Sequence, residues 1–275
     1  MSLSVNTNIS AIEAYNNLNA TNNAMQTSIN QLSSGLKIQN ASQGAADYVI
    51  SQGLQTQANG LGVAINNGQD AVSVLQIATG AMNQQISILQ TMNQLATQAA
   101  NAGANNTTSN NADQQEFTAL QSQLDQIANS TQFGSTQLLD GSYTGQSFQI
   151  GAYASTVDQV VVSIGNLGSA SLGVSGSSIS TASAAFSAMA SVQAAITQVA
   201  SAEAAIGATQ NQIQDIISND TVAQQNVTSA NSTLVDTNMA KAMTNFSSQQ
   251  VLMQAGVAML SQAQALPQLI LKLLP

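Results

Sequence analysis

The sequence contains no cysteine, no histidine, no arginine and no tryptophan. Without cysteine and histidine it cannot supply a thiolate nucleophile, a histidine general base or the usual ligands of zinc. Without arginine it lacks the planar group that binds phosphate through two parallel hydrogen bonds. These absences make an enzyme the least favoured class of function, and no cofactor is expected.

Charge is also scarce, since charged residues make up 5% of the 275 residues, against about 25% in an average protein. The only basic residues are Lys37, Lys241 and Lys272, and the formal net charge is −9. Affinity for nucleic acid and for anionic membrane surfaces comes largely from basic side chains, so neither partner is expected. The N-terminus lacks the basic and apolar regions of a secretory signal peptide, and no apolar run approaches the ~18 residues of a membrane span.

Apolar residues recur every three or four positions at both ends of the chain, which is the spacing of a coiled-coil seam. The predicted N-terminal seam consists of Tyr15, Leu18, Met25, Ile29, Leu32 and Leu36. The predicted C-terminal seam consists of Val235, Met239, Phe246, Met253 and Leu260. Asn22 and Gln249 fall on these seams, where they either set the register or are poorly buried. A second stripe through Met243 and Val257 predicts that the C-terminal helix packs on several neighbours.

The middle of the chain changes pattern twice. Helical periodicity from residue 72 to 100 is broken by a polar stretch, and a shorter helix follows, with Asp113 as its expected cap and Asp125 on a solvated face. The segment "SFQIGAYASTVDQVVVSIGNL" alternates and is rich in β-branched residues, which favours a hairpin or small sheet. Helical periodicity returns near residue 180. The predicted fold is mainly α: a long α-helical coiled-coil rod with paired N- and C-terminal helices and a small β-hairpin region near 131–170.

Several segments, in this order, resemble those of bacterial flagellins. They are "LSSGLKIQNASQGAADYVIS" (32–51), "GQDAVSVLQIATGAM" (68–82), "STQFGSTQLLDG" (130–141), "FQIGAYAS" (148–155), "GATQNQIQ" (207–214) and "QAGVAMLSQAQALPQLILKLL" (254–274). The resemblance covers nearly the whole chain and is that of a minimal flagellin without large outer domains. It implies that residues 1–40 and 231–275 form the two halves of an inner filament-core coiled coil. It also implies a helical rod domain over 41–180 and its return helix over 181–230.

The resemblance implies a function and a set of partners. The chain is expected to polymerise with itself into an extracellular flagellar filament for motility, after passage through the type III export apparatus without a cleaved signal peptide. It is expected to meet the filament cap and hook-junction proteins, and an export chaperone on its C-terminal segment. The chaperone-binding candidates are Met253, Val257, Leu260, Leu266 and Leu269.

One segment departs from the family pattern. Flagellins carry a basic and acidic cluster in the segment that matches residues 89–99, where it joins neighbouring protofilaments and is read by a Toll-like receptor. This chain has Thr91, Asn93 and Gln94 at those places. The candidate inter-subunit and receptor-like residues are Leu89, Gln90, Thr91, Met92, Asn93 and Leu95. Weak or no receptor recognition is therefore expected.

Two other functions remain open from the sequence alone. A hook–filament junction protein shares similar termini, with less faithful terminal motifs and a larger middle. A secreted coiled-coil effector or translocator of a type III system would explain both terminal seams, but not the ordered motifs.

Overall fold

The computed structural model describes residues 7–103 and 106–273, with side chains as far as residue 265. The chain forms two compact units. We call Met1–Thr56 with Val227–Pro275 the terminal unit, and Gln57–Asn226 the central unit. The helices α2 (Ala45–Ala99) and α4 (Ala182–Val235) each contribute residues to both units. The prediction of a mainly α fold with paired terminal helices and a small β-hairpin region is confirmed. The domain boundaries given by the resemblance remain predictions.

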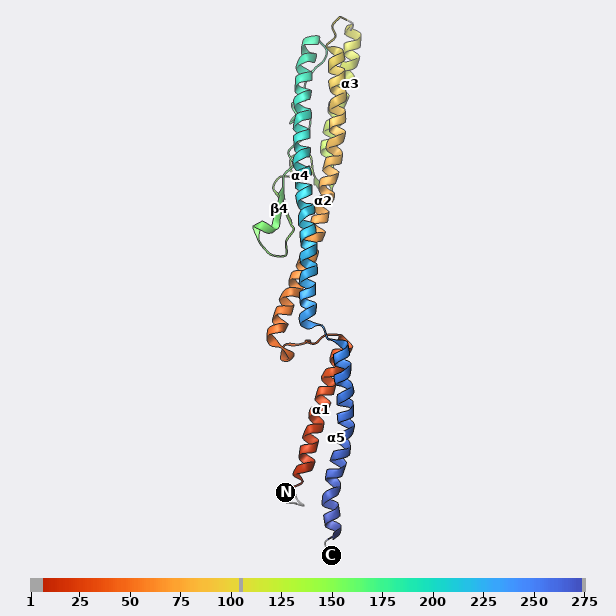
Figure 1. Cartoon of the computed structure of the whole chain (residues 1–275). Helices are drawn as coiled ribbons and strands as arrows, with labels where there is room; N and C mark the ends of the chain where they lie inside the picture. Colours follow the sequence, from red (N-terminus) through yellow and green to blue (C-terminus); the bar gives the residue numbers. More distant parts are fainter. Residues whose placement is uncertain (1–6, 104–105, 274–275) are drawn as a thin grey trace. The chain divides into compact units, whose positions relative to one another are not determined.

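The terminal unit is built on α1 (Ile9–Ser34) and α5 (Met239–Leu273), which lie side by side and antiparallel (Figure 1). The Asn8 side chain caps α1 by accepting a hydrogen bond from the amide of Ala11 at 3.1 Å. Gly35 ends the helix with φ +74° and donates its amide to the carbonyl of Gln31 at 2.9 Å. Glycine suits this position because it adopts the left-handed conformation without steric cost.

A short antiparallel bridge joins the two chain segments that follow α1 and α4. Leu36 pairs with Asp236. The amide of Lys37 donates to the carbonyl of Val235 at 2.6 Å, and the amide of Thr237 donates to the carbonyl of Gly35 at 2.8 Å. The bridge fixes the point at which α5 begins relative to the end of α1. The 3-10 turn η1 (Ala41–Gln43) then leads into α2.

In the central unit, α2, α3 (Thr107–Ser130) and α4 run side by side (Figure 1). Asn106 caps α3, since its side chain accepts from the amide of Ser109 at 2.8 Å. The prediction that Asp113 caps this helix is therefore wrong. Asp113 lies inside the helix and is only 9% exposed. Between these helices lie residues that solvent does not reach, including Leu75, Met82, Leu89, Met92, Phe117, Leu124, Val192, Val199 and Ile213.

The segment between α3 and α4 forms two small antiparallel hairpins. One pairs β1 (Gln132–Phe133) with β2 (Thr136–Gln137), and the other pairs β3 (Gln146–Gln149) with β4 (Gln159–Val162). The turn η2 (Thr156–Asp158) precedes β4. Leu138, Leu139, Ile164, Leu167 and Ile179 of this segment are fully buried and belong to the same hydrophobic core as the helices.

The interpretation of Asp125 as a solvated residue is also wrong. Its two carboxylate oxygens accept hydrogen bonds from the amide and the hydroxyl of Ser169, at 2.7 and 2.8 Å. The carboxylate thus fastens the segment after β4 to α3. Within the described part of the chain, no helix is long and apolar enough to cross a membrane.

Candidate assembly surface

Hydrogen bonds at both ends of the pair fix the register of α1 against α5. Near the start of α1, the side-chain amide of Asn8 donates to the carbonyl of Ala263 at 2.7 Å. Towards its end, the hydroxyl of Ser28 donates to the side-chain carbonyl of Gln249 at 2.9 Å. Ser28 is 5% exposed. A buried hydroxyl that keeps its partner in only one register favours that register over a shifted one.

The face that α1 turns towards α5 differs in part from the predicted seam. Buried and half-buried positions recur at Ala11, Ala14, Leu18, Thr21, Met25, Ser28, Leu32 and Gly35. Leu18, Met25 and Leu32 were predicted. Tyr15, Ile29 and Leu36 lie outside this contact in the single chain, because their side chains are 55%, 43% and 36% exposed. Their place in the self-assembly seam remains a prediction.

Small residues explain this difference. The inner face alternates larger side chains with alanine, threonine, serine and glycine, which lets the two helices approach closely. On the partner helix, a Cβ at Gly256 would lie 3.2 Å from Cδ1 of Leu18. The hydrophobic pattern pointed to the bulky residues at positions 15, 29 and 36. Each follows by one position a small residue that makes the contact, at positions 14, 28 and 35.

On the C-terminal side, Phe246, Met253 and Leu260 are half-buried, and Val235, the last residue of α4, is 9% exposed. Met239 is 49% exposed in the single chain, so its place in the self-assembly seam remains a prediction. Met239 is the first residue of α5, and Ala242, at 4% exposure, takes the buried position one turn later.

Both terminal helices leave large apolar side chains uncovered. They include Ile12, Tyr15 and Ile29 on α1, and Met243, Val251, Leu252, Val257 and Met259 on α5. Many exposed apolar side chains gathered on one pair of helices mark a protein interaction site more often than a free surface. We call these eight residues the uncovered apolar face.

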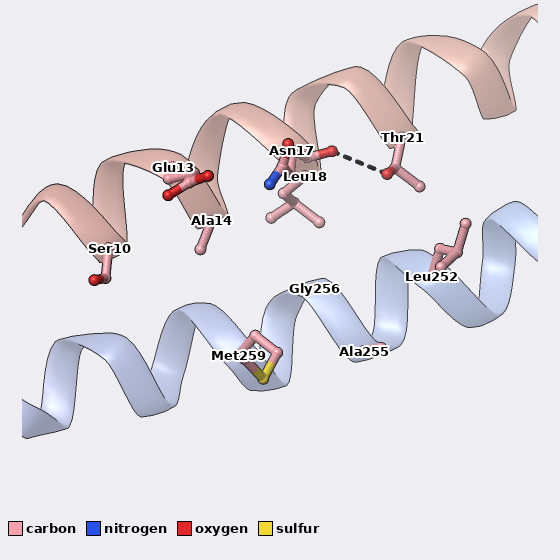
Figure 2. Close-up of a pocket in the computed structure, with 10 residues that line it drawn as sticks. All are labelled: Ser10, Glu13, Ala14, Asn17, Leu18, Thr21, Leu252, Ala255, Gly256 and Met259. Carbon is pink, nitrogen blue, oxygen red and sulfur yellow. Dashed lines mark hydrogen bonds between the residues drawn. The ribbon is translucent and has the colours of Figure 1, made fainter.

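A groove of about 380 Å³ runs between the two helices (Figure 2). In Figure 2 the side chain of Leu18 points towards Gly256, and Thr21 donates to the carbonyl of Asn17 at 2.9 Å. The groove is lined by Ser10, Glu13, Ala14, Asn17, Leu18 and Thr21 of α1, and by Leu252, Ala255, Gly256 and Met259 of α5. Two members of the uncovered apolar face, Leu252 and Met259, are thus also groove residues.

The two units differ in charge. All three lysines belong to the terminal unit. This unit also contains three carboxylates, Glu13, Asp47 and Asp236, so the charges are equal in number. The remaining nine carboxylates lie in the central unit, which has no lysine, arginine or histidine. The terminal unit is therefore formally neutral, and the central unit carries the whole net charge of −9.

The predicted inter-subunit segment on α2 is only partly accessible. Leu89 and Met92 are completely buried in the core of the central unit. Gln90 is exposed, and Thr91, Asn93 and Leu95 are half-buried. Only the side that carries Gln90, Thr91, Asn93 and Leu95 can offer atoms to another molecule.

The chaperone-binding candidates divide similarly. Val257 is 54% exposed, whereas Met253 and Leu260 are half-buried residues of α5. The side chains of Leu266 and Leu269 lie outside the described residues.

Ser28 and Gln85 are buried polar residues that the sequence pattern did not indicate. Ser28 is a small polar residue on the mostly apolar inner face of α1, so the hydrophobic pattern did not indicate that it is buried. Gln85 is completely buried on α2 and donates to the carbonyl of Leu167 at 3.0 Å. Its position on an otherwise apolar helix face is the one clue that the sequence offered. Among the described residues, no group of three or more acidic side chains could hold a metal ion.

Comparison with known proteins matches both ends of the chain to one family. Residues 5–144 match the bacterial flagellin N-terminal helical region, and residues 189–274 match the bacterial flagellin C-terminal helical region. The flagellin of Bacillus subtilis (strain 168) is 35% identical over 98% of this chain and 99% of its own length. Polar flagellin B/D of Vibrio parahaemolyticus is 47% identical over 55% of this chain, which covers 40% of that protein.

The crystal structure of Bacillus cereus flagellin is also similar to this chain. It superposes with a TM-score of 0.50 at 25% sequence identity, over 56% of this chain and 88% of that one. The chain thus spans almost all of the Bacillus subtilis relative but less than half of the Vibrio relatives.

Proposed function

Since the chain belongs to the bacterial flagellin family, we infer that it is the structural subunit of a flagellar filament and serves motility. One observation carries this function. The two matched family segments contain α1 and α5, and among the described residues the pair that these helices form leaves the uncovered apolar face exposed. Other copies of the chain supply that partner when the filament forms.

The physical chemistry of the terminal unit favours self-association. Full burial of one Leu, Ile, Val or Met side chain contributes about 1.5–3 kcal/mol, and eight such or larger side chains are available. The unit is formally neutral, so copies of it can approach without net repulsion. Residues 1–40 and 231–275 then form the filament core, and residues 41–230 form the rod.

Electron microscopy of the purified protein, seeded with filament fragments, tests the function directly. Long helical filaments are expected for the wild type. Ile12→Ser and Leu252→Ser each remove an exposed apolar side chain, at 53% and 58% exposure, so they should abolish or shorten filaments while leaving the central unit folded. The matched controls Ile12→Val and Leu252→Met should polymerise normally. Soluble wild-type protein despite seeds would contradict the filament function.

Lysine modification gives a second test, because every lysine lies in the terminal unit. Lys37 and Lys241 are exposed in the single chain. Apart from the α-amino group, an amine-specific acetylating reagent therefore reports on the terminal unit alone. Acetylation should be strongly reduced in filaments relative to monomers if this unit forms the core. Equal acetylation in both states would place the core elsewhere.

The export partners form a finer part of the same function. The chain leaves the cell through the type III apparatus without loss of a signal peptide, and it meets the cap and hook-junction proteins on assembly. A filament protein whose measured mass corresponds to a chain that starts after residue 2 would contradict this export route.

An export chaperone covers the C-terminal segment before assembly, where Val257 offers exposed apolar surface. Val257→Asp should weaken capture by the chaperone of the same organism, whereas Val63→Asp, at 59% exposure in the central unit, should not.

Recognition by the Toll-like receptor is weak or absent in this proposal. Leu89 and Met92 are buried, and the accessible positions of the segment carry neutral side chains. Receptor-bearing reporter cells treated with purified monomer should respond weakly, while a flagellin with the charged cluster should activate them. A potent response to this chain would reject the proposal.

The two other functions considered from the sequence are not favoured. The curated relatives described above are flagellins. The near-complete alignment with the Bacillus subtilis protein also leaves no larger middle of the kind expected for a junction protein.

A further inference from the structure

The exposed methionines of the described residues all lie on α5. They are Met239, Met243 and Met259, whose side chains are 49%, 52% and 65% exposed. By contrast, Met82 and Met92 of α2 are completely buried in the core of the central unit. The thioether groups that a dissolved molecule can reach are thus gathered on one helix of the terminal unit.

The composition of the chain directs an oxidant towards these side chains. The sequence contains no cysteine, no histidine and no tryptophan, so no thiol, imidazole or indole competes for the oxidant. The methionine thioether is soft and polarizable, and its oxidation to a sulfoxide is a common and reversible reaction. A peroxide that meets the folded chain should therefore attack the exposed methionines of α5.

Met259 belongs to the apolar surface between the two terminal helices. It lines the groove between α1 and α5 (Figure 2). Leu252, one heptad earlier on α5, lines the same groove and is 58% exposed. Leu18 faces them from α1 and lies against Gly256, where an added Cβ would be 3.2 Å from its Cδ1 atom. A polar atom on the Met259 sulfur would therefore enter a surface whose larger side chains are apolar.

Met243 lies in another part of the uncovered apolar face. Its neighbour Ala242 is 4% exposed and occupies the buried position of this turn, so Met243 points away from the helix contact. Val257 follows Met243 at heptad spacing along α5 and is 54% exposed. Both exposed thioethers of the uncovered apolar face thus have an exposed aliphatic side chain on the same side of the helix.

Oxidation makes each of these side chains polar. The sulfur gives an electron pair to one oxygen atom of a peroxide, and the O–O bond breaks as the S–O bond forms. The other oxygen takes the proton of the transferred oxygen and leaves as water or an alcohol. The sulfur is oxidised and the peroxide is reduced. The new sulfoxide oxygen is a hydrogen-bond acceptor, which is costly to bury without a donor.

We propose that Met243 and Met259 are oxidation sites through which a peroxide prevents a monomer from joining a filament. This inference rests on the proposed function, in which other copies of the chain cover both side chains. An acceptor covered without a donor lowers an association constant by about tenfold to a hundredfold. Neighbouring subunits shield the thioethers after assembly, so oxidation blocks only subunits that are not yet incorporated.

Peptide mass spectrometry after treatment with hydrogen peroxide tests the two sites in the full-length monomer. Cleavage after Lys241 and Lys272 places both sites on one peptide, and its fragmentation distinguishes them. Met243 and Met259 should be oxidised about tenfold faster than Met82, or more. In seeded filaments their oxidation should slow by a similar factor. Equal rates at these three methionines in the monomer, or equal rates in monomers and filaments, would overturn the proposal.

Seeded polymerisation tests the consequence of oxidation. Peroxide-treated wild type should require a concentration about tenfold higher than untreated protein, or more. The double variant Met243→Leu/Met259→Leu keeps apolar side chains of similar volume and should polymerise normally before and after treatment. Met239→Leu removes a similarly exposed thioether outside the uncovered apolar face, so it should lose polymerisation on treatment as the wild type does. A treated double variant that fails like the treated wild type would overturn the proposal.

Enzymatic reduction of the sulfoxides provides the reverse experiment. The two methionine sulfoxide reductases, one for each sulfoxide epimer, should restore polymerisation of the treated wild type. If polymerisation stayed lost after mass spectrometry showed both methionines reduced, other damage would be its cause and the proposal would fail. Untreated protein that stays soluble despite seeds would instead contradict the filament function and with it the block of assembly, so the two failures are distinguishable.

Discussion

Ser28 and Gln249 lie 221 positions apart in the chain and meet in the interface of α1 and α5, where the serine hydroxyl donates to the glutamine carbonyl at 2.9 Å. The residues one heptad away from Ser28 are Thr21 on α1 and Gly35 at its C-terminal cap. A seam made of such small side chains gains less from burial than a leucine zipper, so this polar contact has a larger share in fixing the register.

Ser28→Ala should therefore weaken assembly. The loss of a neutral hydrogen bond costs about 0.5–1.5 kcal/mol, and every 1.4 kcal/mol changes an equilibrium by about tenfold. The critical concentration for seeded polymerisation should rise by roughly twofold to tenfold. Ser33→Ala, at an exposed position on the same helix, serves as control. If both variants polymerised equally well, the register would not depend on this contact.

Two glycines of α2 should respond in opposite ways to alanine. A Cβ at Gly68 would lie 2.8 Å from Cγ1 and 3.0 Å from Cδ1 of Ile217, whereas nothing lies within 4 Å of a Cβ at Gly80. Ile217 is β-branched and cannot move aside freely. Gly68→Ala should destabilise the central unit by about 1–3 kcal/mol, and Gly80→Ala should stabilise it by about 0.5–1 kcal/mol. Urea unfolding of the two variants would show the opposite shifts, and shifts of one sign would refute the packing argument.

Asp125 should be the most important carboxylate for the fold of the central unit. Its hydrogen bonds to the amide and hydroxyl of Ser169 are charge-assisted, and such a bond contributes about 1.5–3 kcal/mol. Asp125→Ala should lower the free energy of unfolding by about 2–3 kcal/mol. Asp215→Ala, which removes an exposed carboxylate from the same unit, should change it little. Equal effects in urea titrations would show that the Ser169 contact is not stabilising.

Asp140 should lose its contact with Ser142 in strong acid. Hydrogen bonds from the hydroxyl and then the amide of Ser142 lower the pKa of the Asp140 carboxyl below its ordinary value of 3.8. Its stabilising effect is therefore present above pH 3.8 and is lost as the pH falls through the lowered pKa. The amide of Ser142 should lose protection from exchange only at strongly acid pH. In Asp140→Asn this acid-induced loss should disappear, and an unchanged pH profile would argue against the carboxylate as its cause.

The element types could be predicted from the sequence because apolar spacing directly records which helix faces are buried. The residues on the α1 face could not, because Ala14, Thr21, Ser28 and Gly35 are small or polar and carry no hydrophobic signal. On α5 the inner residues Phe246, Met253 and Leu260 are also the bulky ones, so the pattern and the contact coincide.

Hydrophobic periodicity does not indicate contacts between loops and helices that are far apart in the sequence. The sequence around Asp125 indicates a solvated helix residue, because nothing in it shows that Ser169, 44 positions away, donates hydrogen bonds to this carboxylate. Asn67 and Gln149 are 82 positions apart and carry no signal of the hydrogen bond that joins them. Asp113 was predicted as a cap because acidic residues favour helix N-termini. The helix begins earlier, and Asn106 caps it by accepting from the amide of Ser109.

The separation of basic residues between the two units has a consequence for proteolysis. Proteases of trypsin-like specificity cleave after lysine or arginine, and the chain has no such residue between Lys37 and Lys241. A protease of this class can remove the ends of the chain within the terminal unit but can cut no bond of the central unit, whether that unit is folded or unfolded. The resistance of residues 38–241 to such enzymes is therefore a property of composition and does not depend on the stability of the fold.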